Sequence, residues 1–185
     1  MSEARPSPTK PQRVETTGIR LLEADREHAA CTWRNLFVVY WLGETTPGAV
    51  ARLHQPLLRL GQQHPEKLGL IQVVGASTAA PPSEARDALA KFLKAGGEVI
   101  ACSALVVPGV GFRMAAARAL ATGLVMLARP PFQHQVYATV DQAASWLSSV
   151  VPSLEGPPMQ AREIVAVVTN LQNRVQDRRP PVVPT

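Results

Sequence analysis

Aromatic residues and cysteines are scarce in this chain of 185 residues. Phe, Trp and Tyr together make up 5 % of it, so we expect a core built from Leu, Val and Ala. The two cysteines, Cys31 and Cys102, each lie in an apolar stretch, outside any CxxC or Cys/His cluster. Their surroundings argue against metal binding and favour buried thiols, while a disulfide between them stays open.

Long apolar runs and blocks of basic charge are also missing. No run approaches the ~18 apolar residues of a membrane span, and the stretch MSEARPSPTKPQRVETTG lacks the apolar segment of a secretory signal. We therefore expect a cytoplasmic protein. The net charge is +5, but Lys and Arg are scattered singly or in pairs. Because nucleic-acid binding needs a concentrated basic patch, we expect no nucleic-acid partner.

Motifs of the common enzyme classes are absent from the sequence. It contains no GxSxG, HExxH, P-loop or dinucleotide fingerprint, and its four histidines lie in separate predicted elements. We therefore expect no catalytic residue, no cofactor and no metal. The glycine-rich PGVGF at 108–112, next to Arg113, could bind an anion at a helix N-terminus, although a turn is the preferred interpretation. An enzyme using Arg113 or Arg118 with a distant histidine is a further alternative.

Hydrophobic patterning between residues 18 and 152 predicts alternating strands and helices. The apolar stretch 28–43 is long enough for two strands joined by a tight turn near Arg34 and Asn35, and its LFVVYWL is typical of a strand covered on both faces. The other strands are predicted at 19–25, 68–74 and 98–107.

Three helices are predicted between these strands. Thr46 can cap the first, with Pro47 in the first helical position, and its apolar residues recur at helical spacing. The second is predicted over 83–95 and the third over about 111–122. The residues expected to face inward are Val50, Leu53, Leu57 and Leu60 in the first helix, Ala85, Leu89, Phe92 and Leu93 in the second, and Phe112, Ala116, Ala119 and Leu120 in the third. The following VMLARPP is predicted to be a short strand or edge segment.

The stretch FQHQVYATVDQAASWL at 132–147 changes from a strand pattern to a helix pattern at Thr139. Gln142 stands three positions after Thr139, which is the spacing of a capping box, and Asp141 places negative charge in the first turn. The residues expected to be buried on this helix are Ala143, Trp146, Leu147 and Val150. We expect Trp146 to close the end of the core; a ligand-stacking role is the less favoured interpretation.

The strand and helix order predicts an α/β fold with a mixed or parallel sheet of about 4–6 strands. Three segments match what STAS domains often contain: the strand NLFVVYWLGETT before the first long helix, GFRMAAARAL at the start of the third helix, and the terminal VYATVDQAASWL with its strand, acidic residue and helix. Over residues 19–150 the chain thus resembles the STAS domain, the fold of anti-sigma-factor antagonists and of the cytoplasmic domains of sulfate transporters. It looks most like bacterial antagonist-like domains, which implies a regulatory signalling role through protein binding.

The chain departs from phosphorylatable STAS antagonists at one place. In those proteins an Asp-Ser pair ends a strand, and phosphorylation of the serine changes docking to a kinase. Here the strand continues as VVGASTAAPPSEAR, with no Asp before Ser77 or Thr78 and with two prolines in the loop. We expect Ser83 to cap the following helix, and the resemblance does not carry over a phosphorylation switch.

The two ends of the chain differ from the middle in composition. Residues 1–17 and 178–185 are rich in proline and polar residues, so we expect disordered tails. Residues 157–177 predict an additional amphipathic helix, whose apolar stripe is Ile164, Val168, Leu171 and Val175. This stripe must be buried, either on its own domain or on a partner, including a second copy in a homodimer.

These patterns favour a non-enzymatic interaction module that docks to a partner protein or to itself. The surfaces expected to dock are the start of the third helix (Gly111, Phe112 and Arg113), the loop with Ser77 and Thr78, and the stripe Ile164, Val168, Leu171 and Val175. The alternative from another class is a small-molecule or lipid carrier, because the domain is apolar enough to hold a cavity.

Overall fold

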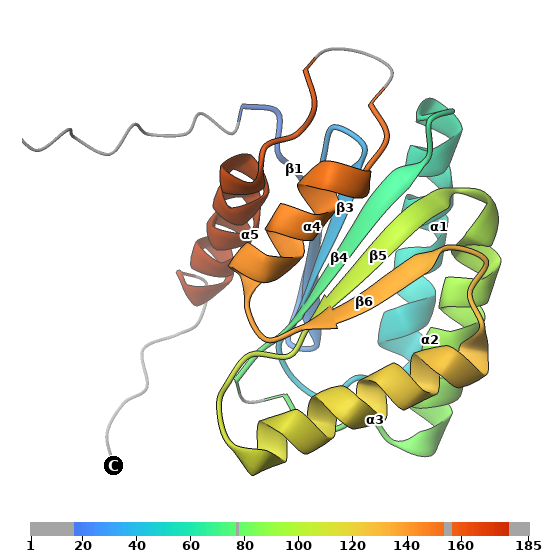
Figure 1. Cartoon of the computed structure of the whole chain (residues 1–185), viewed down its shortest axis with the longest axis vertical. Coiled ribbons are helices and arrows are strands. Elements are labelled where there is room, and N and C mark those ends of the chain that lie inside the picture. Colours follow the sequence, from blue (N-terminus) through green and yellow to red (C-terminus); the bar gives the residue numbers. More distant parts are fainter. Residues whose placement is uncertain (1–16, 77, 154–156, 178–185) are drawn as a thin grey trace, which may run out of the picture.

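A six-stranded mixed sheet forms the middle layer of the molecule (Figure 1). The computed structural model describes residues 17–76, 78–153 and 157–177. The strands are β1 (Arg20–Ala24), β2 (His28–Trp33), β3 (Leu36–Trp41), β4 (Leu68–Val74), β5 (Ile100–Val106) and β6 (Gln133–Tyr137). They lie in chain order, with β1, β2 and β3 antiparallel and β3 to β6 parallel. The predicted α/β fold class is confirmed.

The turn between β2 and β3 fixes one end of the sheet. Arg34 has a φ of 52°, so the chain reverses through a left-handed residue at the predicted position. The side chain of the buried Asn35 then donates hydrogen bonds to the Lys67 carbonyl at 3.0 Å and the Pro152 carbonyl at 2.7 Å. The amide of Asn35 thus joins two segments that are distant in the sequence, the residue before β4 and the segment after residue 150.

Three helices cover one face of the sheet. They are α1 (Pro47–Gln63), α2 (Ser83–Ala95, followed by a 3-10 turn at Gly96–Glu98) and α3 (Phe112–Ala128). Each joins two parallel strands that are direct neighbours, always in the same direction across the sheet. Right-handed crossovers in one direction place all their helices on the same face, as Figure 1 shows.

Two further helices, α4 (Val140–Val150) and α5 (Ala161–Gln176), cover the other face. α5 packs on α4, β2 and β3, and its apolar stripe is buried there. The buried residues of α5 are Ile164, Val167, Val168, Leu171 and Val175. Of the two possibilities that the sequence leaves open for this stripe, the described structure has the helix packed on its own domain.

The helix caps predicted at Thr46 and Thr139 are present, with one difference in detail. The Thr46 hydroxyl accepts a hydrogen bond from the Ala49 N–H, and Pro47 occupies the first turn of α1. The Thr139 hydroxyl accepts from the Gln142 N–H at 3.2 Å. The Gln142 side chain does not complete the capping box on Thr139, because its oxygen accepts from the Ala138 N–H at 3.3 Å.

The prediction was wrong for the segment between β5 and β6. α3 continues to Ala128, so most of VMLARPP is helical and the strand comes later, as β6. Ala116 and Ala119 are exposed instead of facing inward. α3 lies beside β6, the last strand of the sheet, where less apolar surface is available to cover these two alanines.

Two smaller expectations, the cap of α2 and the buried face of α4, also need correction. Ser83 is the first residue of α2 and does not cap it, because Pro82 occupies the cap position. On α4, Ala144 is buried, while Trp146 and Val150 are only half-buried.

No helix in the described ranges is long and apolar enough to cross a membrane.

Substitution of Leu171 by Ala should lower the free energy of unfolding by about 2–5 kcal/mol, because Leu171 is 1 % exposed and fills the core between α5 and the sheet. Thr169→Ala, on the exposed side of the same helix, should change it by less than about 0.5 kcal/mol. Urea unfolding followed by circular dichroism measures both. Equal stabilities for the two variants would contradict the packing of α5 on its own sheet.

Candidate functional site

The carboxyl ends of β3, β4, β5 and β6 meet at one edge of the sheet, since these strands are parallel. The β1–β2 turn lies at the same edge, because His28 pairs with Trp41 at the end of β3. Ligands of open α/β sheets usually bind outside this edge. The loops that form it here lie at 42–46, 75–82, 107–111 and 138–139, with residue 77 outside the description.

Most of the loop residues predicted to dock come together at this edge. Thr78 follows β4, and Gly111 is the cap residue of α3 after β5. Phe112 and Arg113 begin α3, although the placement of their side chains is not described. Ser77 lies outside the described residues. The loop after β4 and the start of α3 are thus parts of one surface.

The loop after β4 is held by the backbone of β3. The Trp41 carbonyl accepts hydrogen bonds from the Gly75 N–H at 2.8 Å and from the Thr78 hydroxyl at 2.9 Å. A Cβ atom on Gly75 would stand 2.6 Å from the same carbonyl oxygen, so the loop requires glycine there. Because the Thr78 hydroxyl already donates to the backbone, a phosphate on Thr78 would have to break this contact.

The glycine-rich stretch after β5 forms a turn that exposes a valine. Gly109 and Gly111 have φ values of 116° and 91°, which side chains rarely adopt. The Arg118 guanidinium donates hydrogen bonds to the carbonyls of Val107 and Gly109 and so holds the turn against α3. Val110 at the tip is 96 % exposed.

α3 continues this exposed apolar surface along its length. None of its described side chains is buried, and those that are exposed carry no charge. The exposed residues follow helical spacing on one side: Ala115, Ala116, Ala119, Thr122, Gly123 and Met126. We call these six residues the α3 face. Met126 and Val110, at 72 % and 96 % exposure, are the two large hydrophobic residues most exposed to solvent in the described ranges.

A charged cluster occupies the other end of the same edge. The Arg52 guanidinium on α1 forms ion pairs with three carboxylates, those of Glu23 at 2.7 Å, Asp25 at 2.6 Å and Glu27 at 2.7 Å. The Thr46 hydroxyl donates to Glu27 at 2.6 Å. These contacts attach the β1–β2 turn to α1.

The pKa values in this cluster follow its hydrogen bonds. The bond from Arg52, followed by that from Thr46, lowers the pKa of Glu27. Burial acts to raise the pKa of Asp25, but the backbone N–H groups of His28 and Glu27 and nearby positive charge outweigh it, so this pKa is lowered. Arg52 meets the charge of all three carboxylates, so we interpret the cluster as structural.

Two neighbouring residues in the sheet carry buried polar atoms without partners. Ser103 on β5 and His134 on β6 are paired in register and point to the face that α2 and α3 cover. The Ser103 hydroxyl and both ring nitrogens of His134 have no hydrogen-bond partner among the described residues. Burial lowers the pKa of His134 to about 4, so its ring is neutral near pH 7.

The two cysteines are not paired. Cys31 on β2 and Cys102 on β5 are free thiols, both buried in the core beneath α4 and α5. Burial raises the pKa of each thiol to about 12. Their thiols are therefore protonated and unreactive at neutral pH, which agrees with the interpretation of the two as small apolar core residues.

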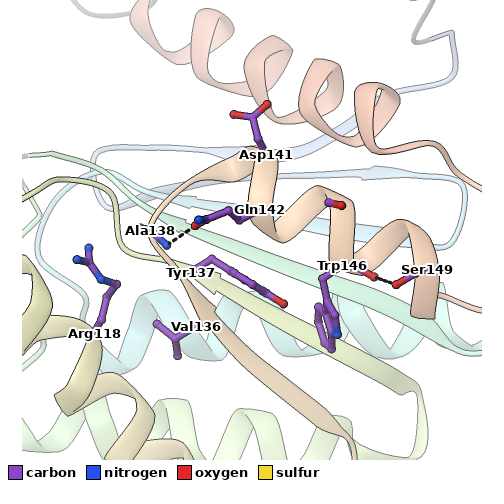
Figure 2. A pocket seen from close by; sticks show the side chains of 9 residues that line it. Arg118, Val136, Tyr137, Ala138, Asp141, Gln142, Trp146 and Ser149 are labelled. Atoms are coloured by element: carbon purple, nitrogen blue, oxygen red, sulfur yellow. Dashed lines mark hydrogen bonds between the residues drawn. The ribbon is translucent and has the colours of Figure 1, made fainter.

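An open groove of about 920 Å³ lies between α3, β6 and α4 (Figure 2). Tyr137 and Trp146 lie next to each other in it, with ring centroids 6.0 Å apart and planes tilted by 45°. Arg118 lines its other end, and no histidine is among its described lining residues. The pairing of an arginine with a histidine in one deep pocket, which an enzyme would need under the alternative above, is not found there.

The remaining residues predicted to dock are buried in the core under α5 and have a structural role there. They are Ile164, Val168, Leu171 and Val175. The sequence did not reveal the α3 face or the groove as sites. The only signal for the α3 face was the absence of acidic residues between 111 and 128. For the groove it was the aromatic pair in VYATVDQAASW.

Replacement of His134 by Phe should make stability less dependent on pH. The pKa of His134 is about 4 in the folded protein and 6.5 in the unfolded chain. The free energy of unfolding is therefore highest above pH 6.5 and decreases as the pH falls towards 4, because only the unfolded chain then binds a proton at this histidine. The wild type should lose about 2 kcal/mol more than His134→Phe between pH 7 and pH 5. Urea unfolding at both values measures this, with the exposed Gln135→Phe as the control that keeps the wild-type dependence. Identical slopes for all three proteins would refute the burial of a neutral His134.

Family models and curated proteins were compared with this chain. No family model matches it, and no curated protein matches it. The resemblance to STAS domains therefore stays an expectation from the sequence.

Proposed function

We propose that this chain is a non-enzymatic regulatory module with a STAS-like fold, which acts by docking to a partner protein through the α3 face. The observation that supports this most is the uncharged, exposed side of α3. A helix on the surface of a soluble domain normally places charged and polar residues on its outer side. α3 places alanine, glycine, threonine and methionine there.

The shape of the α3 face suits a close contact. Ala115, Ala119 and Gly123 follow one another at intervals of four residues, so a partner backbone can approach the helix closely along this line. Met126 within the face and Val110 beyond its amino-terminal end offer the larger side chains that such contacts bury. An exposed apolar patch of this extent is typical of a protein interaction site.

Charge favours a foreign partner over a second copy at this face. α3 contains Arg113 and Arg118 and no acidic residue, and the exposed Arg129 follows it. Two copies packed through α3 would bring like charges together, which costs free energy, whereas an acidic partner surface would gain it. A homodimer through α5 would require that helix to leave its own sheet. We therefore propose an acidic protein surface as the partner of α3.

The element order also supports the proposal. A β-rich opening followed by repeated β–α units is the element order on which the resemblance to STAS domains was based, and STAS antagonists act by docking. The loop with Thr78 and the start of α3 lie at the same edge of the sheet, so a partner on α3 would reach both.

A small-molecule carrier is the second candidate function, because Ser103 and His134 bring unpartnered polar atoms together beneath α3. A ligand with a hydrogen-bonding group could satisfy them. Native mass spectrometry of the purified full chain tests this. A bound mass that is lost in Ser103→Ala would favour the carrier, and a ligand-free spectrum would leave docking as the function.

Substitution of Ala119 by Glu should weaken partner binding at least tenfold, because it places a charge in the middle of the α3 face. The exposed position and the good helix propensity of Glu should keep the free energy of unfolding within about 0.5 kcal/mol of wild type. The partner is first identified by a photo-crosslinking residue at position 119 in native cells, and its affinity is then measured with purified proteins by calorimetry.

The matched control is Ala51→Glu. Ala51 is also an exposed alanine, but it lies on α1, another helix of the layer that contains α3. The substitution makes the same chemical change away from the α3 face and should leave the affinity unchanged. If both variants bind with wild-type affinity, the α3 face is not the contact surface and the proposal fails.

A further inference from the structure

The groove beside β6 is a second surface of the molecule, separate from the α3 face. Its floor holds the rings of Tyr137 and Trp146, which are both half-buried and so leave part of each ring open to solvent. Figure 2 shows the two rings side by side between β6 and α4, with Arg118 beyond them on α3. Two tilted aromatic rings in a shallow groove make separate apolar slots next to each other.

Polar groups that can donate hydrogen bonds surround these rings. The Tyr137 hydroxyl and the Trp146 indole N–H have no hydrogen-bond partner in the described part of the chain. The Gln142 oxygen accepts from the Ala138 N–H, which leaves the Gln142 amide NH₂ group available as a donor. The exposed Ser145 adds a hydroxyl at the rim. The groove therefore combines apolar slots with donors.

This combination fits a polyproline II segment. Such a segment has no internal hydrogen bonds, so its carbonyl groups are free acceptors. Its proline rings fit between aromatic side chains, and it loses little entropy on binding because proline already restricts the backbone. An ordinary extended peptide would lack the proline rings and would lose more entropy on binding.

We propose that the groove binds a proline-rich segment and that its occupant is residues 178–185 of the same chain, RRPPVVPT. This stretch contains Pro181 and Pro184 in PxxP spacing, preceded by Pro180. Its two arginines come before the prolines. In Figure 2, Asp141 projects from the first turn of α4 towards α5, where these arginines would pass on their way to the rings.

The position of α5 makes this contact possible within one molecule. α5 packs directly on α4, and it ends at Gln176. In polyproline II geometry, at ~3.1 Å per residue, Pro181 and Pro184 can reach about 12 Å and about 22 Å beyond Asp177. Both distances exceed the ~10 Å diameter of a helix such as α4, which separates α5 from the groove.

The amino-terminal stretch also contains a PxxP sequence, Pro8 to Pro11, but it starts from the wrong side. The carbonyl of Thr17, the first described residue, accepts a hydrogen bond from the indole of Trp33 on β2, on the side of the sheet away from β6. The groove lies at β6, five strand spacings of ~4.8 Å away. This makes Pro8 and Pro11 the natural control.

The test uses the full chain labelled with 5-fluorotryptophan, whose three ¹⁹F resonances report Trp33, Trp41 and Trp146. The Trp146 resonance is assigned with Trp146→Phe. In the double variant Pro181→Ala/Pro184→Ala it should move, while those of the buried Trp33 and Trp41 stay in place. The double variant Pro8→Ala/Pro11→Ala should leave all three unchanged, and the shift should not depend on protein concentration.

A free RRPPVVPT peptide added to the Pro181→Ala/Pro184→Ala protein should return the Trp146 resonance towards its wild-type position. An unchanged Trp146 resonance in that variant would overturn the proposal, and so would a shift produced by the Pro8/Pro11 variant instead. A shift that disappears on dilution would assign the groove to the tail of a second copy and would overturn an occupant from the same molecule. None of these results depends on a partner at α3, so the two proposals can fail separately.

Discussion

The requirement that the sheet be covered on both faces organises the whole structure. The middle strands are apolar on both sides: in β3, Phe37 and Val39 point to α1 and α2, while Val38 points to α4 and α5. Right-handed crossovers in one direction can supply helices to one face only. The other face would be open to water if α4 and α5 did not pack on it, so α5 belongs to the fold.

The amino and carboxyl ends of the parallel strands differ in their contacts. The contacts that stabilise the fold and the surface proposed to bind a partner are therefore in different places. At the amino edge, Asn35 joins two distant segments by buried hydrogen bonds. At the carboxyl edge, the Arg52 cluster fixes one end, while Val110 and the α3 face remain open to solvent at the other. The apolar surface that the fold does not need for its own core is concentrated beside β6, where the sheet ends.

Local signals in the sequence predicted local structure well. Thr46 with Pro47, the turn at Arg34, and Thr139 were identified because a cap or a tight turn depends on a few adjacent residues. The end of α3 was misplaced, since Thr122 and Gly123 look like a stop signal but lie on the solvent side of a continuing helix. The groove could not be predicted, because Arg118, Tyr137 and Trp146 come from three elements that only the tertiary fold brings together.

The agreement between strand order and chain order has a consequence for biosynthesis. Each strand of this sheet can add to the one made just before it, so the sheet can grow while the chain is still being translated. The face that α4 and α5 cover must wait, because these helices are translated after every strand. A nascent chain that has completed β6 therefore exposes a row of apolar side chains until α5 emerges. Exposed apolar surface of this kind makes a chain prone to aggregation, so this interval is the most vulnerable one in its synthesis.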